Sequence, residues 1–160
     1  MPLISRQEAI RNAVLGCEDG VVSTTGLLCA LHLAGDMSAE KIYRTALVTV
    51  VIQALSMALG AYMAASTSSR PQSETSPIAG AASTFLAYML SSACIYAAFS
   101  IHPAIRLPAC IASAATILFI VAYLTDRQGS RSTEHRVEKA IQVSFLALCA
   151  VFAGLAIGGG

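Results

Sequence analysis

The chain has 160 residues, of which 56% are hydrophobic and only 12% are charged, and its mean hydropathy is +0.67. Soluble domains carry about 25% charged residues, so this composition excludes an ordinary soluble domain and indicates an integral membrane protein. The net charge is +1, and no basic helix or interleaved basic and aromatic residues suggest a nucleic-acid partner.

Hydropathy predicts an all-α membrane protein, a single domain of residues 1–160 with five transmembrane helices. Each apolar segment has about the 20 residues needed to cross the hydrocarbon layer. The expected spans are residues 9–34, 43–65, 77–100, 104–124 and 140–157. No connection between them is long enough to hold a soluble domain.

The Lys and Arg residues that flank these spans predict the orientation. An N-terminus on the cytoplasmic side places seven of the ten cationic residues there, and the other side receives only Lys41, Arg44 and Arg106. Cytoplasmic loops carry an excess of Lys and Arg, so we expect the N-terminus inside and the C-terminus outside. The sequence leaves open whether the membrane is a plasma (inner) membrane or an organellar or vacuolar membrane.

The first span carries two adjacent carboxylates, Glu18 and Asp19. A charge at membrane depth costs roughly 2.5–3.5 kcal/mol, so such an acid usually faces a cavity or a partner and often marks an ion or proton path. Helical spacing places Asp19 on one stripe with Gly16, Gly20 and Ser23. Gly16 and Gly20 form a GxxxG pattern, which lets another helix approach closely. The stripe fits either plain helix packing or a path, and we expect it to form a two-fold interface with a second copy.

Two neighbours of Asp19 leave alternatives open. Glu18 points about 100° away from Asp19, so it joins the path, snorkels toward the cytoplasmic side or pairs with Arg11. Cys17 lies beside the acids and could offer a soft ligand, whereas the other four cysteines are expected to be small packing residues.

The second span has a matching polar stripe of Thr49, Gln53, Ser56, Met57 and Gly60. Met57 alone would usually be a core residue. Opposite a membrane carboxylate it is a candidate ligand, because carboxylate oxygen and thioether sulfur together suit a borderline divalent transition metal. The chain contains no HExxH pair and no glycine-rich phosphate loop, so we expect neither an enzyme nor a permanently bound cofactor.

Two segments carry a family resemblance. Residues 11–24 read R-N-A-V-L-G-C-E-D-G-V-V-S-T and resemble R-x-A-V-L-G-A-N-D-G-L-V-S-T, the first-helix signature of the vacuolar iron transporter (VIT) family. Residues 54–62 read A-L-S-M-A-L-G-A-Y and resemble A-L-S-M-A-x-G-E-Y on that family's second helix. Residues 77–85 are similar to the start of its third helix. The two motifs occur in the same order and within the same five-span layout.

The resemblance implies a homodimer of five-helix subunits in membrane lipid, with the ion path between the two copies of the first helix. By motif position, Asp19 would be the membrane carboxylate of that path and Met57 its thioether. The implied activity is proton-coupled export of Fe²⁺ from the cytoplasm, with Mn²⁺ as a second substrate. A carboxylate in low-dielectric surroundings keeps its proton until a cation replaces it, which agrees with antiport.

The chain departs from the family pattern at two places. Ala61 stands where the family has a second-helix Glu, and Glu18 stands where it has Asn, so Glu18 would compensate if both positions reach the same cavity. Residues 66–76 contain a single acid where the family's iron transporters usually carry a Glu- and Met-rich cytoplasmic metal-binding insertion. Two functions are therefore considered: a metal/proton transporter that uses Asp19, Glu18 and Met57, and a non-transporting membrane scaffold or assembly subunit of the same fold.

Overall fold

The computed structural model describes residues 6–35, 37–67, 76–126 and 133–158, and every regular element in these ranges is helical. The expected all-α class is therefore confirmed for the described part of the chain. In chain order the elements are α1 (Arg6–Leu33), α2 (Ala39–Thr67), α3 (Pro77–Phe99), the short 3-10 helix η1 (Pro103–Ile105), α4 (Arg106–Asp126) and α5 (Thr133–Gly158).

Four stretches in the described ranges are long and apolar enough to cross a membrane, namely α1 from residue 8, α2, α3 and residues 103–125. They correspond to the first four predicted spans, with ends that differ by a few residues. The fifth predicted span falls on α5, whose apolar part covers only residues 140–153 and is shorter than a standard span. The described part of the chain is thus that of a helical membrane protein with four candidate spans and one further apolar helix.

The helix ends follow from local sequence. Between α1 and α2, Gly35 has a φ of +74°, a conformation that glycine takes without a Cβ penalty. Pro77 begins α3, where a missing backbone N–H costs nothing. Before η1, the ring Nδ1 of His102 accepts a hydrogen bond from the Ala104 N–H at 3.3 Å. These features explain why the breaks between helices fall where the sequence places Gly and Pro.

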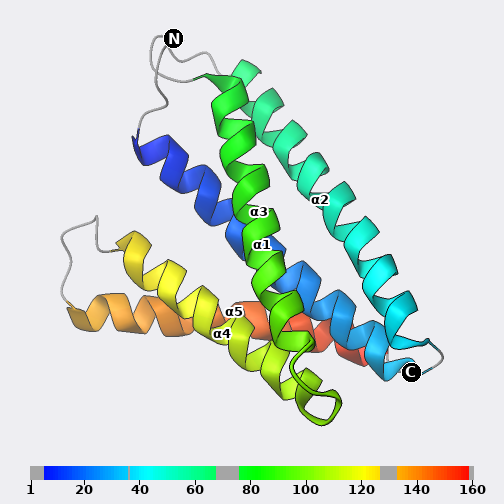
Figure 1. The fold of residues 1–160 in the computed structure, drawn as a ribbon. Coiled ribbons are helices and arrows are strands. Elements are labelled where there is room, and N and C mark those ends of the chain that lie inside the picture. Colours follow the sequence, from blue (N-terminus) through cyan, green and yellow to red (C-terminus); the bar gives the residue numbers. More distant parts are fainter. Residues whose placement is uncertain (1–5, 36, 68–75, 127–132, 159–160) are drawn as a thin grey trace.

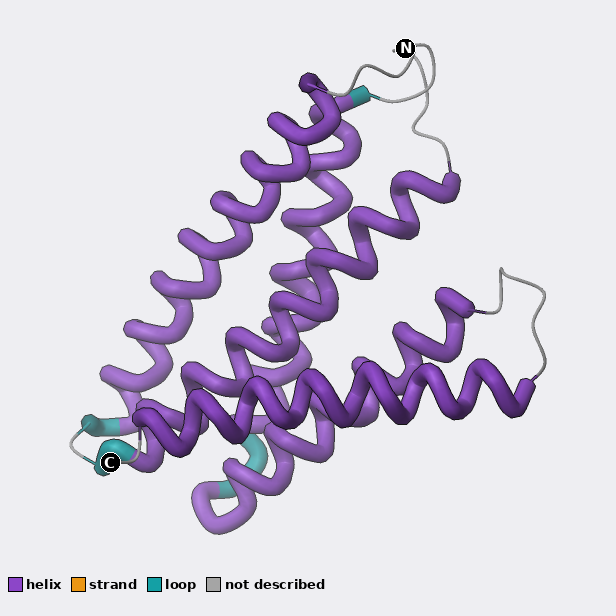
Figure 2. The backbone as a smooth tube through the Cα atoms, turned by 180° about the vertical axis from the view of Figure 1, so that it is seen from behind, coloured by secondary structure: helices purple, strands orange, loops and turns teal. Residues whose placement is uncertain are grey.

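The central helix is α1, which packs against each of the other four helices and most extensively against α3. Figure 1 shows α1, α2 and α3 gathered together, with α4 and α5 forming a pair that crosses them. The view from behind in Figure 2 shows α5 running across α1, in agreement with the packing between these two helices. Residues on α1 therefore lie within reach of every other helix.

One side of α2 packs on α1 and α3, and its other side is apolar and open. The large side chains on this open side are between 53% and 61% exposed: Leu47, Val48, Ile52, Leu55, Leu59 and Met63. A surface of this kind would aggregate in water, so it suits contact with lipid.

The GxxxG pair of α1 faces α3 of the same chain. A Cβ added to Gly20 would lie 2.5 Å from Ser91 Oγ and 2.8 Å from the Tyr88 carbonyl oxygen. A Cβ added to Gly16 would overlap the Thr84 carbonyl oxygen. The prediction that these glycines form the two-fold interface is therefore wrong. A pattern of small residues specifies a close approach of helices but does not say which helix approaches.

A cavity lined by two carboxylates and a thioether

The three residues predicted to hold a metal ion line one cavity, which we call the acid cavity. It has a volume of about 410 Å³ and lies between α1, α2, α4 and α5. Glu18 and Asp19 reach it from α1, and Met57 reaches it from α2. Its other walls are apolar: Leu15, Val22, Leu118, Val143 and Ala147. Carboxylate oxygens with a thioether sulfur form a donor set suited to a borderline divalent metal.

Glu18 contributes to this cavity although it points away from Asp19 on the helix. Both side chains line it, together with residues of α2, α4 and α5. Within the described residues, Glu18 forms no ion pair with Arg11. The geometry thus favours the path over the pairing with Arg11 that the sequence left open.

A second cavity, which we call the vestibule, lies between the N-terminal part of α1, the C-terminal part of α2 and the start of α3. It has a volume of about 540 Å³ and is polar on one side, where Glu8, Arg11 and Asn12 line it. Leu15 and Met57 line both the vestibule and the acid cavity. The two cavities therefore adjoin at Leu15 and Met57.

Three α2 residues from the sequence analysis line the vestibule and not the acid cavity: Ser56, Gly60 and Ala61. Glu18 lines the acid cavity and is absent from the vestibule wall, so the condition set for compensation between Glu18 and Ala61 is not met. The acid that shares a cavity with Ala61 is Glu8.

Ser23 and Gln53 belong to neither cavity wall but are joined by Tyr88 of α3. The Tyr88 hydroxyl donates to Gln53 Oε1 at 2.7 Å, and Ser23 Oγ lies 2.6 Å from the Tyr88 hydroxyl oxygen. Ser23 Oγ also donates to the Asp19 carbonyl oxygen at 2.6 Å. We call Ser23, Tyr88 and Gln53 the hydroxyl bridge.

Tyr88 was not predicted from the sequence. A signal was present, because α3 carries a stripe of hydroxyl side chains at helical spacing, and all of its members are buried: Thr84, Tyr88, Ser91 and Ser92. Hydroxyls that repeat along one face of an apolar helix indicate polar contacts with neighbouring helices.

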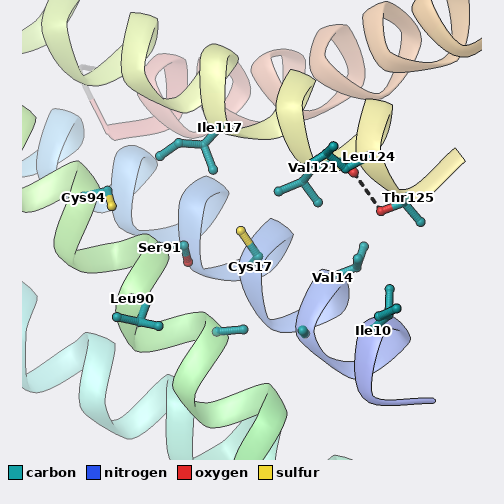
Figure 3. A pocket seen from close by; sticks show the side chains of 12 residues that line it. Ile10, Val14, Cys17, Leu90, Ser91, Cys94, Ile117, Val121, Leu124 and Thr125 are labelled. Carbon is teal, nitrogen blue, oxygen red and sulfur yellow. Dashed lines mark hydrogen bonds between the residues drawn. The ribbon is translucent and has the colours of Figure 1, made fainter. Parts of the chain in front are cut away.

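Cys17 points away from the acid cavity. It lines a separate, largely apolar cavity of about 500 Å³ between α1, α3 and α4. Figure 3 shows Cys17 in this cavity with Ser91 and Cys94 of α3. Cys17 is therefore not a ligand for a cation held by Asp19, contrary to the alternative raised from its position in the sequence.

Residues 10–72 match the model of the VIT family. The matched segment contains nearly all of α1 and the whole of α2, and it includes every residue that the sequence analysis placed in the path. Over this segment the chain is similar to the VIT family. No curated protein and no solved structure matches it.

The VIT family is a family of transporters and not of enzymes, so this match suggests transport of metal ions across a membrane. The two motifs that resemble the VIT family meet at the acid cavity, because Asp19 belongs to the first motif and Met57 to the second. Tyr88 lies outside the matched segment, as do the α4 and α5 residues of the cavity wall.

Proposed function

We propose that this protein is a proton-coupled transporter that moves a divalent transition metal, Fe²⁺ or Mn²⁺, out of the cytoplasm. The observation that carries the proposal is the acid cavity, in which Glu18, Asp19 and Met57 lie together inside segments apolar enough to cross a membrane. An acid at this depth costs free energy, so its presence indicates a function.

The chemistry of the cavity supports the coupling to protons. The described walls are apolar and hold no Lys or Arg, so a carboxyl group is held in its neutral form until a metal ion arrives, since an isolated charge is costly in such surroundings. A divalent ion requires deprotonated oxygen ligands, so metal binding releases protons. Metal release on the other side lets the carboxylate take up a proton again, which completes an exchange of metal for protons.

The vestibule supports entrance from the side of the α1 N-terminus, which is the cytoplasm in the proposed orientation. A cation would pass from Glu8 to Met57 and then to Asp19, since Met57 lines both cavities. Ala61 leaves the α2 side of the vestibule without the Glu that the family has there. In this chain Glu8 would therefore serve as the acid of the entrance.

We also propose that the protein is a homodimer in which α1 of the second copy covers Asp19. Asp19 is exposed in the single subunit, and a membrane carboxylate facing lipid would be costly. Gly26 lies two turns along the same face of α1, and a Cβ added there would meet nothing within 4 Å. A small residue beside open space allows a second helix to approach.

Replacing Gly26 with leucine is therefore expected to convert dimers into monomers without unfolding the subunit, because the new side chain would occupy the space of the partner helix. Size-exclusion chromatography with light scattering in detergent measures this mass. The control is Ala112→Leu, which adds a similar side chain at an exposed position of α4. A Gly26→Leu protein that remains dimeric would place the interface on another face.

The transport proposal is tested with the purified protein in liposomes that contain one dye sensitive to pH and one sensitive to Mn²⁺. Mn²⁺ added outside is expected to enter while the lumen becomes more alkaline, because protons leave in exchange. Metal entry without a pH change would contradict the coupling. Signals equal to those of empty liposomes would favour the scaffold or assembly subunit.

A further inference from the structure

Tyr88 has an unusual position for a polar residue of a membrane helix. Its side chain is 0% exposed and is the largest of the fully buried side chains in the described structure. The helix that carries it, α3, lies against both α1 and α2, and the hydroxyl contacts one side chain from each. Tyr88 therefore joins two helices that the chain connects only at their far end, through residues 34–38.

The two side chains that Tyr88 joins stand in the same relation to the acid cavity. Ser23 follows Asp19 by four residues on α1, and Gln53 precedes Met57 by four residues on α2. Because α1 and α2 run in opposite directions (Figure 1), both positions lie about one helical turn, or roughly 5.4 Å, from the cavity on the same side. The hydroxyl bridge thus spans α1 and α2 directly beyond the pair of metal donors.

The hydroxyl protons that are available show which hydrogen bond depends most on Tyr88. Each hydroxyl group has one proton to donate. Tyr88 donates to Gln53 Oε1, so its oxygen can only accept from Ser23. Ser23 has a second acceptor at the same distance of 2.6 Å, the Asp19 carbonyl oxygen. Loss of the Tyr88 hydroxyl leaves Ser23 with an acceptor but removes the donor to Gln53, which frees α2 from the bridge.

We propose that Tyr88 is a positioning residue for metal binding, which sets the separation of Asp19 on α1 from Met57 on α2. The proposal rests on the proposed function, since it assumes that these two residues hold the transported ion. Tyr88 does not line the acid cavity and acts only through Ser23 and Gln53. Donors held at a fixed spacing bind an ion more tightly, because the ion does not have to order them.

The test compares Tyr88→Phe with Tyr43→Phe. Both changes remove one hydroxyl. The Tyr43 hydroxyl, however, bonds to Ser100 Oγ at 2.9 Å, near the start of α2 and just after the end of α3. Tyr88→Phe is expected to weaken Mn²⁺ binding about tenfold, the size expected for the loss of the membrane hydrogen bond to Gln53. In liposomes its KM for Mn²⁺ should rise by a similar factor while the maximal rate stays within about twofold. Tyr43→Phe should leave both values unchanged.

A second variant, Gln53→Met, keeps the size of the side chain and removes the acceptor, so it tests the bridge if Tyr88→Phe fails to fold. It is expected to weaken Mn²⁺ binding as much as Tyr88→Phe does. The double variant should be little weaker than either single variant, because both interrupt the same contact. Binding equal to that of Tyr43→Phe in both single variants would overturn the role of Tyr88.

Asp19→Asn separates this failure from a failure of the proposed function. Mn²⁺ binding that requires Asp19 but is indifferent to Tyr88 and Gln53 would overturn only the positioning role. Binding that does not require Asp19 would overturn both proposals. Electron paramagnetic resonance of free Mn²⁺ measures the affinity directly, without any transport.

Discussion

Replacing Asp19 with asparagine is expected to abolish metal-driven proton exchange and to leave the fold and the dimer intact. The amide has nearly the size of the carboxylate, but it carries no charge and cannot release and take up a proton as a carboxyl group does. The Asp19 hydrogen bond in the described structure uses its backbone carbonyl oxygen, which the substitution keeps. In liposomes, Mn²⁺ entry and the accompanying pH change should both fall to the level of empty liposomes, while chromatography shows an unchanged dimer.

Glu18→Gln is the matched variant for this experiment, because it removes a carboxylate from the same cavity. With Asp19 retained, the exchange should continue at lower affinity for the metal. Exchange that survives Asp19→Asn and is lost in Glu18→Gln would transfer the role of the exchanging acid to Glu18. Exchange at the normal rate in both variants would remove the acid cavity from the path.

The helices could be predicted because apolar length is a property of each segment alone. The first four spans are borne out within a few residues, and the breaks occur where Gly35, Pro77 and Pro103 end or begin helices. The fifth segment differs, because α5 starts at Thr133 among charged residues and its apolar part is short. Hydropathy located this helix, whose apolar part covers residues 140–153 of the described chain.

The sequence could predict only those features of the site that depend on a single helix. Motif and spacing placed Asp19 and Met57 on polar stripes, and the structure brings these two stripes to one cavity. Helical spacing gives the direction of a side chain but not the neighbour that it meets. For this reason the neighbour expected for Gly20 was wrong, the separate cavity of Cys17 could not be foreseen, and Tyr88 was missed.

Replacing Gly20 with leucine is expected to prevent stable folding of the subunit, the largest structural effect that we predict. An added Cβ would already lie 2.8 Å from the Tyr88 carbonyl oxygen, and a backbone atom in the middle of α3 cannot move aside without separating the two helices. The contact between α1 and α3 is the most extensive in the molecule, so its loss affects the whole fold. Most of the protein should be recovered as aggregate.

The smaller change Gly20→Ala allows a measurement on folded protein. It is expected to lower the free energy of unfolding by about 1–3 kcal/mol, the usual range for an overpacked contact. Gly60→Ala is the matched control, since an added Cβ there meets nothing within 4 Å. That change should stabilise the helix by up to about 1 kcal/mol, because alanine favours a helix over glycine. Unfolding in detergent should therefore separate the two variants in opposite directions from the unmodified protein. Equal stability of the two variants would mean that α1 and α3 do not pack closely at Gly20.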